Sequence, residues 1–327
     1  MSFNSSLLQV SGKLLAEQLS GKHRAYFFFT TFGSIAVISN ITVVLVYVSS
    51  SVLRCTYRVV TALAIADLIN GLSFVLNGVY KIVEFGMMTY IPEISMHDCA
   101  LKPWPALRLI GGQWAALLTF CLGSERILAV RYPFAYVAFH EKRQATCIMI
   151  TALLVGVSLM IAYIFPTLIK PDRPTDFQCS LSLAFGLPYS IFNYAITITA
   201  DMIGFSFSVA AYYMAKVSAK KSGIRMPLRK ELARTRLIFL LSLLSVVLVA
   251  VPNAIILKAI TGKSYSDAVF DYVYCIFCIR SCLNILIFGV YNVDFRSQLL
   301  KVVSHLLSIT SGFIKNCFIS LYTLGFE

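Results

Sequence analysis

Two adjacent charged residues, Glu125 and Arg126, end an apolar run that begins near Trp104. Charge inside a membrane helix costs about 2.5–3.5 kcal/mol even on insertion scales, so such residues usually pair with each other or serve a function. In the alternative interpretation, the pair only marks where the helix reaches the cytoplasmic headgroups. Further charged residues lie within the apolar runs, among them Asp67, Arg108, Asp201 and Arg280.

The residue types that support catalysis or metal binding do not gather in these runs. Ser124 has no histidine near it in the sequence, and no glycine-rich phosphate loop accompanies Glu125 and Arg126. We therefore expect no enzyme activity, no cofactor and no metal. The four histidines all lie outside the apolar runs, at His23, His97, His140 and His305.

The apolar runs themselves predict an all-α membrane protein. The chain has 327 residues, 58% of them hydrophobic, and a mean hydropathy of +0.78, which is far more apolar surface than a soluble domain buries. About 20 apolar residues cross a bilayer as a helix. Seven runs meet this length, so we expect a seven-transmembrane helix bundle with spans at 26–48, 59–83, 104–130, 145–169, 184–214, 237–257 and 268–291.

The rest of the chain predicts three further segments around the bundle at 26–291. Residues 1–25 form an extracellular N-terminus, 292–307 a short amphipathic eighth helix, and 308–327 a cytoplasmic tail. Apolar residues recur along 292–307 at a spacing that suits a helix lying in the membrane interface. These residues are Phe295, Leu299, Leu300, Val303 and Leu306.

The distribution of charge predicts the orientation. The formal net charge is +13, and most of the excess Lys and Arg falls in the segments expected on one side, above all 215–236. Positive residues concentrate on the cytoplasmic side, which places the N-terminus outside. Asn4, in Asn4-Ser5-Ser6, then matches a glycosylation acceptor. A nucleic-acid partner is not expected, because the basic residues form no soluble face.

The polar positions of the spans, taken together, resemble those of the rhodopsin-like G-protein-coupled receptors. Their common order and spacing carry the resemblance, which covers nearly the whole chain. The matching motifs are Ser39-Asn40, Leu63-Ala64-Ile65-Ala66-Asp67, Glu125-Arg126-Ile127, Pro252, Asn284-Ile285-Leu286-Ile287-Phe288, Asn292-Val293-Asp294-Phe295-Arg296, and the outer cysteines Cys99 and Cys179.

The motifs also depart from the usual family pattern. Ile285 and Phe288 stand where the family has Pro and Tyr in span seven, and Ile127 replaces the Tyr that normally follows the Glu-Arg pair. This altered set is most similar to the nematode serpentine chemoreceptors of the Srsx kind. For such receptors the expected location is the plasma membrane, and in sensory cells the cilium.

The resemblance implies roles for several residues. Glu125 and Arg126 would pair at rest and act in G-protein coupling, together with Asn284 and Phe288. Cys99 and Cys179 would form the outer disulfide. Glu231 is the only acidic residue that could hold Arg126 from span six, and it has basic neighbours. We therefore expect a weak lock between spans three and six, and some basal activity.

A buried polar network is expected around Asp67. Arg280 lies four residues before Asn284, on the same face of span seven, and the resemblance places Asp67 opposite that face. We expect an Asp67–Arg280 ion pair with Asn40 and Asn284 around it, in place of the sodium ion that the family often holds there. In the alternative, Arg280 reaches water in the outer cavity.

A ligand site is expected near Arg108. This residue precedes Arg126 by 18 positions, or about five helical turns, so both lie on one inward stripe. A cation there favours an anionic or carbonyl-rich ligand; the alternative is a structural pair with Asp201, Asp98 or Asp176. Further candidates for the ligand site are Gly112, Gln113, Asp201 and Asn253, and Gly111 beside them leaves room for a ligand or a neighbouring backbone.

These features predict a chemosensory G-protein-coupled receptor that binds an extracellular small molecule and activates a heterotrimeric G protein. A neuropeptide-type receptor is an alternative, because the outer loops carry acidic residues. A multi-spanning secondary transporter is the alternative in another class, although the chain has no internal repeat of the kind many transporters contain.

Overall fold

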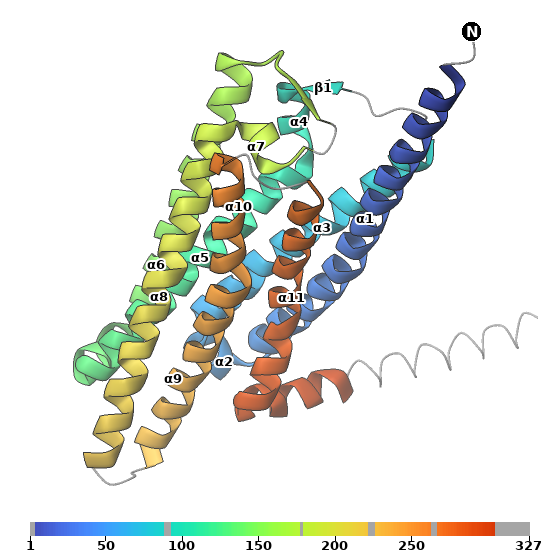
Figure 1. Cartoon of the computed structure of the whole chain (residues 1–327). Helices are drawn as coiled ribbons and strands as arrows, with labels where there is room; N and C mark the ends of the chain where they lie inside the picture. The colour runs from blue at the N-terminus through green and yellow to red at the C-terminus, as the bar shows by residue number, and fades with distance from the viewer. Residues whose placement is uncertain (1–3, 88–92, 177–178, 222–225, 263–266, 305–327) are drawn as a thin grey trace, which may run out of the picture.

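The computed structural model describes residues 4–87, 93–176, 179–221, 226–262 and 267–304. It is an all-α bundle whose long helices run side by side (Figure 1). Within the described residues, seven helical segments are long and apolar enough to cross a membrane, as the hydropathy pattern predicts. They are His23–Ser49, Arg58–Glu84, Pro103–Arg131, Lys142–Ile169, Leu187–Ser218, Leu232–Gly262 and Val273–Tyr291.

The elements follow one another in a simple order along the chain. They are α1 (Asn4–Ser49), α2 (Ser51–Thr56), α3 (Arg58–Met87), β1 (Glu93–Ser95), α4 (Met96–Leu101), α5 (Pro103–Arg131), α6 (Pro133–Ile164), η1 (Phe165–Ile169), β2 (Pro174–Asp176), α7 (Leu181–Phe185), α8 (Leu187–Lys221), α9 (Met226–Ser245), η2 (Val246–Ala250), α10 (Val251–Gly262) and α11 (Asp267–Tyr291). Residues 293–304 form a further helix.

The end of the bundle that carries Cys99 and Cys179 is called the outer end below, and the opposite end the inner end. At the inner end the helices are longer than expected. Residues 133–143 belong to α6, and α8 continues to Lys221 before α9 begins at Met226, so the expected loops at 131–143 and 215–236 are largely helical. Hydropathy marks only the apolar part of a helix, whereas backbone hydrogen bonding continues through the polar turns beyond it.

At the outer end the expected span five divides in two. Gly186 has φ 84°, a left-handed conformation that glycine adopts at no steric cost. It separates the short helix α7 from α8. The expectation of one helix from residue 184 onward was therefore wrong by one turn, because a run of apolar residues does not reveal a break at a single glycine.

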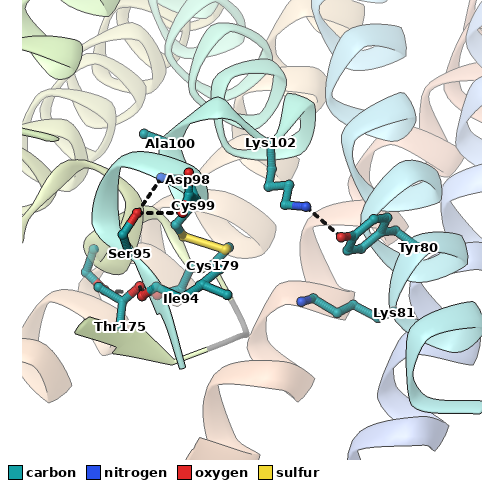
Figure 2. The surroundings of a disulfide bond; sticks show 12 residues. Tyr80, Lys81, Ile94, Ser95, Asp98, Cys99, Ala100, Lys102, Thr175 and Cys179 are labelled. Carbon is teal, nitrogen blue, oxygen red and sulfur yellow. Dashed lines mark hydrogen bonds between the residues drawn. A yellow bond between two sulfur atoms is a disulfide. The ribbon is translucent and has the colours of Figure 1, made fainter. Parts of the chain in front are cut away.

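The disulfide between Cys99 and Cys179 joins the two outer connections, and the Cα atoms of the two residues lie 5.3 Å apart. Figure 2 shows this bond beside the antiparallel pair β1–β2, in which Ile94 lies opposite Thr175. The Ser95 side chain accepts a hydrogen bond from the backbone of Asp98 and caps α4. These contacts fix α7, which follows Cys179, over the outer end of the bundle.

The core consists of two apolar clusters, one in each half of the bundle. Helix α5 packs against α3 and α8, and α1 packs against α3 and α11. Glycines permit the closest approaches: a Cβ atom added to Gly204 would lie 2.9 Å from the Cα atom of Phe120. Helix α5 is thus the central element of the bundle, in contact with helices on two sides.

Span six is interrupted at mid-length. The π-helical segment η2 (Val246–Ala250) immediately precedes Pro252, whose ring nitrogen cannot donate a backbone hydrogen bond. Single π-helical turns of this kind relieve the helix at such points and are frequent at functional sites. The position expected to kink span six is therefore the position where its regular helix changes.

The helix at 293–304 packs against the inner end of the bundle, as Figure 1 shows for the red segment after α11. Asn292 caps it, because its Oδ1 atom accepts a hydrogen bond from the backbone N–H of Phe295. Phe295 is fully buried against Tyr47 and Phe288. Leu300 is 66% exposed and Val303 42%, so the predicted apolar face divides between the bundle and the expected bilayer.

Candidate functional site

A cluster of polar side chains surrounds Glu125 and Arg126 at the inner end of α5. Both residues are buried, and the Nη2 atom of Arg126 donates to Oε1 of Glu125 at 3.1 Å. The Tyr136 hydroxyl accepts from Arg126 at 2.8 Å and donates to the same Glu125 oxygen at 2.5 Å. Gln144 donates to that oxygen at 2.9 Å. The pair is therefore held inside the protein rather than released to the headgroups.

Sequence reasoning did not identify Tyr136 and Gln144, because it assigned 131–143 to a loop. The signal that could have found Tyr136 is Pro133, since proline favours the first turn of a helix. A helix that begins there brings Tyr136 and Gln144 onto one face, eight residues or about two turns apart. The side chain of Glu231, the expected weak lock, lies outside the described residues.

The ion pair expected at the centre of the bundle is present. Arg280 Nη1 lies 2.6 Å from Asp67 Oδ1, and Asp67 is completely buried. Asn284 donates to the other Asp67 oxygen at 2.7 Å, and the Ser281 hydroxyl lies 3.4 Å from the first. The alternative required the Arg280 side chain to reach water in the outer cavity. The ion pair with Asp67 excludes that arrangement.

Asn40 belongs to the same layer but contacts Asp67 only indirectly. Its amide donates to the backbone oxygens of Ala36, at 2.8 Å, and Ser281, at 3.2 Å. It thereby joins α1 to α11 next to the ion pair. Along the spans this polar layer separates the outer apolar cluster from the inner one.

A cavity of about 60 Å³ lies directly above this layer, toward the outer end. A cavity needs roughly 10–15 Å³ to hold one water molecule, so this one has room for more than one. Leu181 of α7 lines it, so the segment held by the disulfide contributes to its wall. The polar residues that line it are Asn70, Arg108, Asn193, Tyr194, Thr197, Asp201, Asn253, Tyr274 and Arg280.

The candidates for the ligand site are only partly brought together. Arg108, Gly112, Asp201 and Asn253 all line the cavity. Gln113 does not: it lies in the crevice between α5, α6 and α8 and faces the Tyr189 hydroxyl at 3.4 Å. One residue along a helix rotates the side chain by about 100°, so the expectation that Gln113 shares the ligand site with Gly112 was wrong.

The two neighbouring glycines of α5 have different environments. A Cβ atom at Gly111 would lie 2.6 Å from the backbone nitrogen of Asn70, whereas one at Gly112 would meet nothing within 4 Å. The sequence left it open whether these glycines make room for a ligand or for a neighbouring backbone. Gly111 makes room for the backbone of α3 and so permits close packing of α5 on it, and Gly112 makes room in the cavity.

Other cavity residues were not identified in advance. Asn193, Tyr194 and Thr197 come from α8, and Tyr274 from α11. Asn193 and Thr197 lie four residues apart, which is the spacing of one helical face. That pattern was available in the sequence, but it could not be distinguished from the ordinary polar residues of a long span.

The search for relatives adds no assignment: no protein-family model matches the chain, and no curated protein matches it significantly. The described residues contain no group of three or more His, Cys, Asp or Glu side chains that could hold a metal ion. The candidate site therefore consists of the outer cavity, the polar layer below it and the Glu125–Arg126 cluster at the inner end.

Proposed function

We propose that the chain is a receptor similar to the rhodopsin-like G-protein-coupled receptors, most like the nematode serpentine chemoreceptors of the Srsx kind. It binds a small molecule at its outer end and activates a heterotrimeric G protein at its inner end. The observation that carries the proposal is that one helix, α5, lines a polar cavity through Arg108 and holds the buried Glu125–Arg126 cluster about five turns away.

The arrangement supports transmission between the two ends by population shift. A ligand can shift a conformational equilibrium only if it binds one state better than the other. The cavity borders α10 through Asn253 and η2 through Val249, so an occupant contacts span six at its π-helical interruption. Movement of span six would then open the inner end to the G protein.

The size of the cavity favours a small ligand over a peptide. It is enclosed by α3, α5, α7, α8, α10 and α11, and its accessible volume of about 60 Å³ is too small for a peptide. On this proposal the N-terminus lies outside the plasma membrane, and the Cys99–Cys179 disulfide faces the oxidising side, where such bonds persist.

A transporter is the second candidate, favoured by one specific observation. Buried charges and an interrupted helix meet at mid-depth, where Arg280, Asp201 and η2 surround the same cavity. Secondary transporters place their substrates in such positions. Transport would leave the Glu125–Arg126 cluster without a role, so the two functions make different predictions for Arg126.

The test compares wild type with Arg126→Ala, each checked for surface expression, in cells that report G-protein activation. Small acids, neutral volatiles and amine-containing compounds are applied in turn. We expect at least one class to activate wild type and none to activate Arg126→Ala. A response that survives Arg126→Ala at equal surface expression would contradict the assignment of this cluster to coupling.

A further inference from the structure

The cavity contains a cation whose hydrogen-bonding groups have no partner. The guanidinium carbon of Arg108 lies 4.4 Å from the centroid of the Phe74 ring and 4.6 Å from that of Tyr274. Its Nε and Nη2 atoms are buried without a hydrogen bond, and no ion pair in the described part of the chain involves it. The rings contact the guanidinium faces, so the N–H groups at its edge remain to be satisfied.

The same cavity contains an anion in the same condition. Asp201 of α8 is only 1% exposed and lines the cavity, and its Oδ2 atom has no hydrogen-bond partner. The charges that influence it most are Arg280 and Asp67, which already bind each other at 2.6 Å. Among the described residues, no ion pair joins Asp201 to Arg108 or to any other cation.

We propose that the cavity binds a small zwitterion, whose carboxylate pairs with Arg108 and whose ammonium group pairs with Asp201. This inference rests on the proposed function only in taking the cavity as the ligand site. A simple anion would satisfy Arg108 and leave Asp201 buried without a partner, and a simple amine would do the reverse. A ligand with both charges satisfies both groups at once, and it leaves neither charge buried without a partner, which is the costly arrangement.

The separation of the two residues limits the length of the zwitterion. Gly204 packs against Phe120, so Asp201, almost one turn earlier, lies near the level of Ala116, which also lines the cavity. Arg108 is eight residues above Ala116 on α5, about 12 Å along the axis. Because the two side chains and two hydrogen bonds together cover most of this distance, the test varies the number of carbons between the two charges of the amino acid.

The partly buried amides add directional contacts between the two charges. Asn193 has an Oδ1 atom without a partner, and Asn253 is buried at the cavity wall on α10. An extended aliphatic amino acid would place its methylene groups beside Ala115 and Ala116. The cavity therefore offers opposite charges at its ends and an apolar wall between them.

The test measures the thermal unfolding midpoint of the full chain in lipid nanodiscs, which requires no G protein. The compounds are glycine, 3-aminopropanoate, 4-aminobutanoate, 5-aminopentanoate and 6-aminohexanoate, with butanoate and butylamine as single-charge controls. A ligand that binds the folded state raises the midpoint in proportion to its affinity. We expect one amino acid of the series to raise it most, and neither single-charge control to reproduce the rise.

Three variants make the assignment specific. Arg108→Gln and Asp201→Asn should each weaken binding of the best amino acid at least about 30-fold, as removal of one partner of a buried pair does. Asp172→Asn, an exposed carboxylate outside the cavity, is the matched control and should change nothing. Asp201→Glu keeps the charge and the fold but lengthens the side chain by one carbon, so the preferred amino acid should become one carbon shorter.

The outcomes separate this proposal from the receptor assignment. Equal stabilisation by butanoate, with no effect of Asp201→Asn, would replace the zwitterion by a simple anion. No stabilisation by any member of the series would overturn the proposal. A raised unfolding midpoint with an amino acid that does not activate a G protein would support the zwitterion site and contradict the receptor function.

Discussion

At the scale of single residues, the central feature is the Asp67–Arg280 pair. Its presence was predicted because Arg280 shares the face of Asn284 and the family resemblance implied that Asp67 lies opposite that face, and the geometry confirms the pair. The protein thus supplies its own cation for the buried Asp67 carboxylate. The unpaired state of Arg108 and Asp201 was not predictable, because spacing along a helix does not determine which partner a long side chain reaches.

The first prediction concerns this pair. Asp67→Asn or Arg280→Met alone should lower the free energy of unfolding by about 3–5 kcal/mol, because each leaves the other charge buried and unpaired. Exchange of the two charges, as Asp67→Arg with Arg280→Asp, should restore part of that loss. Thermal unfolding in nanodiscs measures both effects, with Asp172→Asn as the control for loss of an exposed carboxylate.

Two results would speak against this interpretation of the pair. Single variants as stable as wild type would show that the pair contributes nothing. A midpoint that depends on sodium over potassium in wild type would indicate that a metal ion, rather than Arg280, balances Asp67.

At the scale of the elements, hydropathy predicted where the spans lie but not where the helices end. The apolar parts of spans one to three agree with the sequence expectation within a few residues, but α1 begins at Asn4, well before its apolar part. The helical inner turns of α6 and α8 were missed, since polar helices leave no hydropathy signal. The docking of Phe295 was implied by the amphipathic pattern, but the partners Tyr47 and Phe288 were not.

The prediction at this scale uses the two adjacent glycines of α5. Gly111→Ala should destabilise the protein, because the new methyl group meets the Asn70 backbone at 2.6 Å and forces α5 away from α3. Gly112→Ala should leave the stability unchanged or raise it by about 0.5–1 kcal/mol, since alanine favours a helix more than glycine does. Unfolding midpoints of the two variants give the comparison directly.

Gly112→Ala should also weaken the response to a ligand. Gly111→Ala cannot test this effect, because it is expected to destabilise the fold as well. The methyl group added at Gly112 enters the cavity, so the response should weaken although the fold is intact. Equal destabilisation by both variants would contradict the packing described for α5. An undiminished ligand response in Gly112→Ala would exclude this cavity as the binding site.

At the scale of the whole molecule, the described residues form a bundle with seven helices long enough to span a membrane, a polar cavity toward its outer end and a buried Glu–Arg cluster at its inner end. The sequence predicted the bundle because apolar length and composition determine what a bilayer accepts. It could predict the components of the candidate site, but not their grouping. Gln113 and Gly112 are neighbours in the chain and face different spaces, and Tyr136 closes a cluster that sequence reasoning limited to two residues.

The proposed receptor function depends most on whether the Glu125–Arg126 cluster couples to a G protein. The most direct measurement is nucleotide exchange by purified heterotrimeric G proteins on vesicles that contain the protein, without any ligand, for wild type, Arg126→Ala and Tyr136→Phe. We expect exchange above that of empty vesicles for wild type, and none for Arg126→Ala. Tyr136→Phe should increase exchange, because the hydroxyl that holds Arg126 and Glu125 is removed.

Solute flux can be measured in the same vesicles, and it supplies the result that would contradict the receptor function. Absence of exchange with every G protein tested, together with flux of small amino acids that Arg126→Ala leaves unchanged, would contradict the receptor and favour the transporter. Exchange that requires Arg126 and increases when Tyr136 loses its hydroxyl would establish that the inner cluster is the coupling site.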